Sequence, residues 1–159
     1  MTFKDVLNKF QNDRAIPDEF IESIEDNRGL KIEMIDYFKV NEDREFVIHL
    51  LNKMVEFRTQ DKGMTGDSIM LGCYILGLHN NIEDCLRIWN VKTTDFDTFC
   101  YVDIQLISFA GLDKTIDYLK SSNSKEAEDA LKYVLDCKKS GDFDNLDSYF
   151  VKDSLPWYV

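Results

Sequence analysis

The chain has 159 residues, of which 44% are hydrophobic and 31% charged, a composition that suits one folded domain and is globular rather than disordered. Its 30 acidic and 19 basic residues give a formal net charge of −11, spread along the whole chain. This charge disfavours nucleic acid and anionic membranes as partners and favours a basic protein. Two prolines and seven glycines provide little turn chemistry for a many-stranded β fold, so helices are favoured.

The first third of the chain carries the signals of four helices. They are expected over residues 2–12, 17–27, 30–38 and 41–60. Thr2 stands where it can cap the first helix, and Pro17 stands at the opening of the second. Gly29 can close the second helix in a left-handed conformation, and Asn41 can cap the fourth.

Residues 61–66, Asp-Lys-Gly-Met-Thr-Gly, form the best interior linker. They separate the charged N-terminal third from an apolar centre but are too short to separate two domains. We therefore expect a single all-helical domain over residues 1–159. Within it, residues 1–62 hold the N-terminal helices and residues 63–159 hold a stack of helical hairpins.

The centre of the chain begins with the most apolar segment. A helix over 67–79 is apolar nearly all round, as expected for a helix buried between neighbours. Gly72 and Gly77 each cost about 1 kcal/mol relative to alanine inside a helix, so the close approach of another backbone best explains them. Asn81 is placed to cap the next helix, over 82–90.

The later elements repeat this plan. Helices over 94–110 and 112–122 form a second pair, which aligns with the first at a shift of 31 residues, for example Ile75 with Leu106. Such spacing is typical of stacked helix-hairpin repeats. A third pair is expected over 125–140, capped by Asn123 or Ser124, and over 143–150. The apolar residues at 157–159 are expected to pack back onto the helices. The predicted fold is all-α, either a HEAT/TPR-like solenoid or an irregular multi-helix bundle.

The cysteines and histidines do not have the spacing of a metal site. Cys73, His79 and Cys85 are six residues apart each way, whereas zinc ligands are usually two to five apart. Cys73, Cys85, Cys100 and Cys137 lie in helical patterns and no secretory signal precedes them, so we expect reduced core thiols in a cytoplasmic protein. No apolar run is long enough to cross a bilayer.

The sequence shows no common catalytic or nucleotide-binding motif, and we expect neither catalysis nor a cofactor. His49 is interpreted as a surface or boundary histidine. Asp103 is the unusual polar residue, because the helical projection of 94–110 places it among apolar side chains. It either anchors a neighbouring helix or lies in a pocket with a raised pKa, and anchoring is the preferred interpretation.

The acidic and aromatic start of helix 94–110 is the best candidate for a partner-binding edge, because turns of stacked hairpins line up along one rim. Plain N-capping is the alternative role for each carboxylate. The candidate residues along this rim are Asp36, Glu42, Asp43, Glu45, Glu83, Asp84, Asp95, Phe96 and Asp97.

The stretch GLHNNIEDCLRIWNVKTTDFDTFCYVDIQLISFAGLDKTIDYLK and the final PWYV resemble, in general character, the helical-repeat immunity proteins that bacteria encode beside their toxins. Many such toxins are basic nucleases, and their inhibitors commonly cover the active site with carboxylates. The resemblance implies an immunity protein, a monomer or small homo-oligomer, that neutralises a cognate basic toxin. It carries no diagnostic motif, so no site residue is transferred from it.

Two other functions stay open. The chain could bind a small molecule, or act on one, in an inter-helix pocket around Asp103, with Tyr101 and His79 as further residues of interest. It could also be a generic helical-repeat scaffold for another protein.

Overall fold

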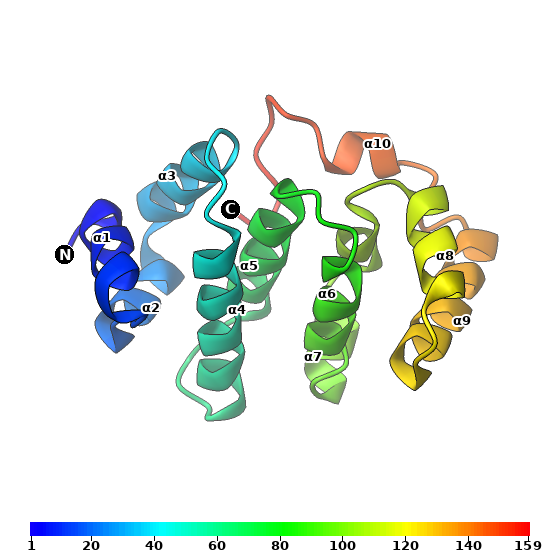
Figure 1. The fold of residues 1–159 in the computed structure, drawn as a ribbon, viewed down its shortest axis with the longest axis horizontal. Coiled ribbons are helices and arrows are strands. Elements are labelled where there is room, and N and C mark those ends of the chain that lie inside the picture. Colours follow the sequence, from blue (N-terminus) through cyan, green and yellow to red (C-terminus); the bar gives the residue numbers. More distant parts are fainter. The chain divides into compact units, whose positions relative to one another are not determined.

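The computed structural model describes all 159 residues, and its regular structure is entirely helical, which confirms the all-α prediction (Figure 1). None of its helices combines the length and apolar character needed to cross a membrane. The chain divides into two compact units. Unit 1 comprises Met1–His79 and Trp157–Val159, and unit 2 comprises Asn80–Pro156. The division therefore follows residue 79, whereas the sequence suggested a subdivision after residue 62.

Unit 1 contains five helices. They are α1 (Phe3–Asp13), α2 (Asp18–Asp26), α3 (Arg28–Phe38), α4 (Arg44–Thr59) and α5 (Gly66–Leu78). The predicted cap of α1 is confirmed, because the Thr2 hydroxyl accepts a hydrogen bond from the Asp5 N–H at 3.2 Å and the Asp5 carboxylate accepts one from the Thr2 N–H at 2.9 Å. This reciprocal capping box satisfies two N–H groups that an α-helix leaves without partners.

Two predicted helix boundaries in unit 1 are wrong. Gly29 does not close α2, because it lies in the first turn of α3, and Asn27 caps that helix by accepting from the Leu30 N–H at 3.0 Å. Asn41 does not cap α4 either. Its side-chain amide donates to the Tyr37 carbonyl at 2.8 Å, and α4 begins three residues later. Asn27 therefore sets the start of α3, whereas the Asn41 side chain bonds back to the end of α3 instead of capping α4.

Helix α5 is buried almost throughout and packs along α4, as its apolar sequence predicted. At Gly72 a Cβ atom would lie 2.9 Å from Leu51 Cδ1 and 3.3 Å from Met54 Sδ. The predicted close approach is therefore present, but side chains of α4 make it rather than a backbone. For Gly77, which is also buried, the explanation stays a prediction.

The same substitution at two helical glycines should have opposite effects. Gly72→Ala gains about 1 kcal/mol of helix propensity but overpacks the contact with Leu51, which typically costs 1–3 kcal/mol, so we expect a net loss of about 1 kcal/mol. Gly29→Ala meets only Asn27 Oδ1 at 3.4 Å and should be neutral or stabilising by about 0.5 kcal/mol. Urea unfolding followed by circular dichroism measures both. Equal effects at the two positions would contradict the close packing of α5 on α4.

The core around the N-terminal end of α4 is aromatic. The Phe46 ring lies with its centroid 5.3 Å from that of Phe10 and 6.0 Å from those of Phe3 and Phe38. These four rings come from α1, α3 and α4 and are at most 3% exposed. Aromatic packing of this kind joins α1, α3 and α4 around one centre.

The final residues of the chain pack with unit 1. Tyr158 is 4% exposed, and the Arg28 guanidinium donates to the Val159 carbonyl at 3.4 Å. The predicted return of this apolar segment to the helices is confirmed for Tyr158. Trp157 remains 66% exposed, although its ring contacts that of Tyr158.

Unit 2 is built around its first helix. Its elements are α6 (Asp84–Lys92), α7 (Phe96–Tyr101), the 3-10 helix η1 (Ile104–Ser108), α8 (Leu112–Ser121), α9 (Lys125–Ser140) and α10 (Leu146–Tyr149). Helix α6 packs against α7, η1 and α9, while α8 packs against η1 and α9. Asn81 does not cap α6 as predicted. Its side chain accepts from the Glu83 N–H at 3.2 Å in the preceding turn, and the helix begins at Asp84.

The predicted helix over 94–110 is also wrong, because it breaks into α7 and η1. Val102 and Asp103 between them have extended backbone angles, with ψ of 118° and 133°. The Lys92 ammonium, from the end of α6, donates to the carbonyls of Phe99 and Val102 at 2.5 Å each. It thereby satisfies carbonyl groups at the end of α7 that a continuous helix would have bonded internally.

Candidate functional site

Helix α7 presents the most exposed aromatic group of unit 2. Phe96 is 79% exposed and Tyr101 is 46% exposed, with the exposed Asp97 on the same short helix. Asp95 precedes them and caps the helix by accepting from the Thr98 N–H at 2.7 Å, so the N-capping alternative holds for this carboxylate. We call Asp95, Phe96, Asp97 and Tyr101 the α7 surface. Its solvent-exposed rings stand beside carboxylates, as the sequence suggested.

The two other candidate carboxylates of unit 2 do not join this surface. Asp84 is 1% exposed and pairs with Arg87 at 3.4 Å, so the prediction that it lies on a binding rim is wrong. Glu83 is exposed, but it stands at the opposite end of α6 from α7 (Figure 1). Nine helical residues span about 13 Å, which is too far for Glu83 and Asp97 to form one contact point.

The four candidate carboxylates of unit 1 lie around the connection between α3 and α4. Glu45 pairs with Arg14 at 2.9 Å, and Asp43 accepts a hydrogen bond from the Tyr37 hydroxyl at 2.5 Å. Asp36 and Glu42 are exposed. Half of this group is thus already engaged within unit 1, as Asp95 is on α7. The α7 surface is the stronger candidate because it also presents the exposed Phe96 ring.

The contact between Tyr37 and Asp43 predicts a measurable pH dependence. The hydrogen bond to the carboxylate, helped by burial, raises the pKa of Tyr37 from 10.0 to about 12. Because the folded-state pKa is raised, the bond's stabilising contribution is fully present below pH 10 and is lost as the pH rises through about 12. We expect Asp43→Asn to move the pKa of Tyr37 back toward 10, as followed by NMR titration of the Tyr37 ring. Asp36→Asn is the control, and an equal shift in that variant would contradict the assignment.

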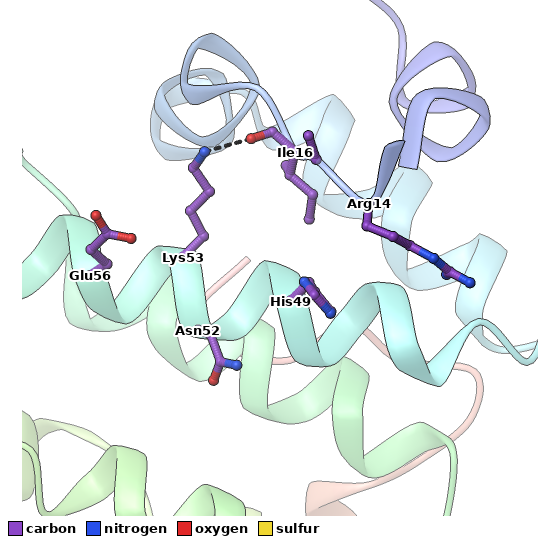
Figure 2. A pocket seen from close by; sticks show the side chains of 7 residues that line it. Arg14, Ile16, His49, Asn52, Lys53 and Glu56 are labelled. Carbon is purple, nitrogen blue, oxygen red and sulfur yellow. Dashed lines mark hydrogen bonds between the residues drawn. The ribbon is translucent and has the colours of Figure 1, made fainter. Parts of the chain in front are cut away.

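A shallow hollow of about 300 Å³ lies between α4 and the segment that follows α1 (Figure 2). Lys53 donates to the Ile16 carbonyl at 2.6 Å and pairs with Asp18 at 2.6 Å. Figure 2 shows the Arg14 guanidinium extending away from the Lys53 ammonium, with His49 between them. The cationic groups are therefore satisfied separately and do not converge on a common ligand position.

A larger hollow of about 410 Å³ lies within unit 2. The lining side chains include Lys92, Phe99, Cys100, Asp103, Tyr133 and Asp142. Asp103 is half-buried rather than enclosed, and it accepts a hydrogen bond from the Tyr149 hydroxyl at 2.8 Å. The helical projection that placed it among apolar residues does not apply, because the helix has already ended at Tyr101. The bond to Tyr149 fits the anchoring interpretation, and the hollow keeps a binding role open.

Neither His79 nor Tyr101, the two other residues of interest, lines this hollow. His79 belongs to unit 1, where its Nδ1 lies 3.1 Å from the Ile75 carbonyl, and Tyr101 lies on the α7 surface. Cys73 and Cys85 are buried core thiols as predicted, and burial raises the pKa of each to about 12. Cys100 is exposed, so its prediction as a core residue is wrong.

Sequence reasoning missed Lys92, the most unusual charged residue of unit 2. It is 3% exposed, and its ammonium lies 4.7 Å from the centre of the Phe99 ring and 5.7 Å from that of Tyr133. Burial lowers the pKa of Lys92, and the negative charge of Asp103 opposes this shift. The available signal was its spacing, since Lys92 continues the apolar stripe of Ile88 and Trp89 at i+4 and i+3.

No group of three or more His, Cys, Asp and Glu side chains is arranged to hold a metal ion. Comparison with known proteins finds no family model, no curated protein and no solved structure that matches the chain.

Proposed function

We propose that this chain is a protein-binding module that binds a basic protein partner through the α7 surface. The supporting observation is Phe96, a large aromatic side chain that is 79% exposed and stands between Asp95 and Asp97. Aromatic side chains dominate the binding energy of many interfaces, and adjacent carboxylates select a cationic partner. The net charge of −11 would accelerate the encounter with such a partner.

Within this proposal the partner is a toxin domain, most simply a basic nuclease, and the chain is its immunity protein. A nuclease active site carries cationic groups for the phosphate backbone, so an acidic surface placed over it would exclude the nucleic acid. Asp97 of the α7 surface would face those groups. The proposal places the chain in the bacterial cytoplasm, where its four free cysteines would stay reduced.

The test begins with affinity capture from the native organism, followed by expression of the captured partner as a purified protein. Support requires a basic partner whose enzymatic activity this chain inhibits at a one-to-one ratio. The association rate constant should fall about tenfold or more as ionic strength rises from about 0.01 to 0.3 M, because electrostatic steering is screened by salt. A rate constant that is insensitive to salt, or a partner that is acidic, would contradict the proposal.

Alanine substitutions at two residues with the same exposed fraction test whether the α7 surface is the binding surface. Phe96→Ala should weaken binding about tenfold or more, whereas Val40→Ala in unit 1, where the side chain is also 79% exposed, should have no effect. Glu42→Gln tests the carboxylates of unit 1. Weakened binding in Glu42→Gln alone would make the α7 assignment wrong while leaving the protein-binding function intact.

A further inference from the structure

The hollow in unit 2 contains a buried cation that the protein satisfies only in part. Lys92 is 3% exposed, and two of its three N–H groups donate to the carbonyls of Phe99 and Val102. It forms no ion pair with a carboxylate of the chain, although it lines the hollow. A buried ammonium without a direct counter-ion is costly, and a ligand carboxylate in the hollow would remove that cost.

The same hollow carries negative charge close to Lys92. The carboxylates of Asp103 and Asp142 also line it, and Asp103 is near enough for its charge to act on Lys92. The Tyr149 hydroxyl donates a hydrogen bond to the Asp103 carboxylate at 2.8 Å. Burial, and after it the negative charge of the nearby Asp142, raise the pKa of the Cys137 thiol. The Gln105 amide donates to the Asp142 backbone carbonyl at 2.6 Å, which ties the backbone at Asp142 to η1 beside Asp103.

This pattern of charge selects the ligand. Two carboxylates repel a simple anion, and the Lys92 ammonium, which already lies over the Phe99 and Tyr133 rings, repels a simple cation. A molecule that carries a carboxylate and an ammonium on the same carbon atom can place its carboxylate toward Lys92 and its ammonium toward Asp103. The remaining walls include the apolar side chains of Val102 and Ile104, and a volume of about 410 Å³ suits a ligand of amino-acid size.

We propose that the unit 2 hollow is a binding site for a free α-amino acid with an apolar side chain, with Lys92 receiving the carboxylate and Asp103, assisted by Asp142, receiving the ammonium. This site is separate in its chemistry from the α7 surface and does not depend on the binding of a protein there.

The test is an NMR titration of the full-length chain with each of the twenty common L-amino acids at up to about 10 mM. Saturable shifts of the backbone signals of residues 92, 99–105 and 133 are expected for apolar amino acids. The best ligand is then compared with two analogues of the same skeleton. For leucine they are 3-methylbutylamine, which lacks the carboxylate, and 4-methylpentanoate, which lacks the ammonium. Each analogue should bind at least tenfold more weakly.

Conservative variants check the assigned roles without removing Lys92. Asp103→Asn keeps an acceptor for the Tyr149 hydroxyl but loses the charge, so it should weaken amino-acid binding at least tenfold while retaining the folded spectrum. Asp147→Asn, an exposed carboxylate on α10, is the matched control and should bind as the wild type does. The proposal is overturned if no amino acid gives saturable shifts at the hollow, if either analogue binds as well as the amino acid, or if Asp103→Asn binds normally. None of these results bears on the α7 surface, which is tested by Phe96→Ala.

Discussion

Replacing Lys92 with methionine should destabilise unit 2 by about 3 kcal/mol, although the two side chains are similar in length. The substitution removes both donors from the carbonyls of Phe99 and Val102, which are then left without these partners beside the break between α7 and η1. A hydrogen bond to a charged group contributes roughly 1.5–3 kcal/mol, and two are lost. The apolar methionine recovers part of this loss, because burying the lysine had required the desolvation of a charge.

Urea unfolding monitored by circular dichroism measures this loss, and amide hydrogen exchange shows where it acts. The exchange of amides in η1 and the last turn of α7 should accelerate most. Lys120→Met on α8 is the control, because Lys120 is exposed and its loss should change stability by less than about 0.5 kcal/mol. A loss below about 1 kcal/mol for Lys92→Met would show that the ammonium does not hold the break in place.

Replacing Phe46 with alanine should cost unit 1 about 4 kcal/mol, the largest effect that we expect from a single substitution. Phe46 is 2% exposed and contacts three other phenylalanine rings from α1 and α3. Truncation of its side chain leaves a cavity between these helices, and their packing prevents them from moving in to fill it. The lost aromatic contacts add to the lost burial.

The same substitution at Phe96 is the control for Phe46→Ala. Phe96 is 79% exposed, so its truncation should change the free energy of unfolding by less than about 0.5 kcal/mol while weakening partner binding. The two variants therefore separate a residue that stabilises the fold from one that is available to a partner. Comparable losses of stability at the two positions would mean that Phe96 is packed rather than exposed.

The parts of the fold that the sequence predicted are those where local signals agree. Helix α9 follows the side chain of Ser124, which accepts from the Ala127 N–H at 3.1 Å, and ends at Gly141 with a φ of 86°. Between them the apolar residues keep a 3.6-residue period, so capping and packing indicate the same helix. Helix α1 was predictable for the same reason, since Thr2 and Asp5 form its cap within one turn.

The break within 94–110 could not be predicted from these signals. The segment has a helical apolar period, but the interaction that ends α7 comes from Lys92, which is 7 and 10 residues away from the two carbonyls that it binds. A contact of this kind exists only after α6 and α7 have packed together. The same limit affected Asp103, because its predicted environment depended on the helix continuing past Tyr101.

The sequence predicted the exposure of the candidate residues that open the short helix α7. It did not predict exposure correctly where packing against other helices decides it. Phe96 and Asp97 open a short helix after a turn and are exposed, as the sequence indicated. Asp84 also stands in a first helical turn, yet packing buries it to 1% exposure beside Arg87. An acidic residue in a first turn therefore does not by itself indicate a surface.

The two tryptophans of the chain fall in different units and in opposite environments. Trp89 in unit 2 is 6% exposed, whereas Trp157 in unit 1 is 66% exposed. Intrinsic fluorescence should therefore shift strongly to the red when unit 2 loses its structure and only slightly when unit 1 does. A Trp157→Phe variant would make the tryptophan emission a reporter of unit 2 alone. Comparing its transition with that of the circular dichroism signal, to which both units contribute, would show without any added label whether unit 2 melts before or after unit 1.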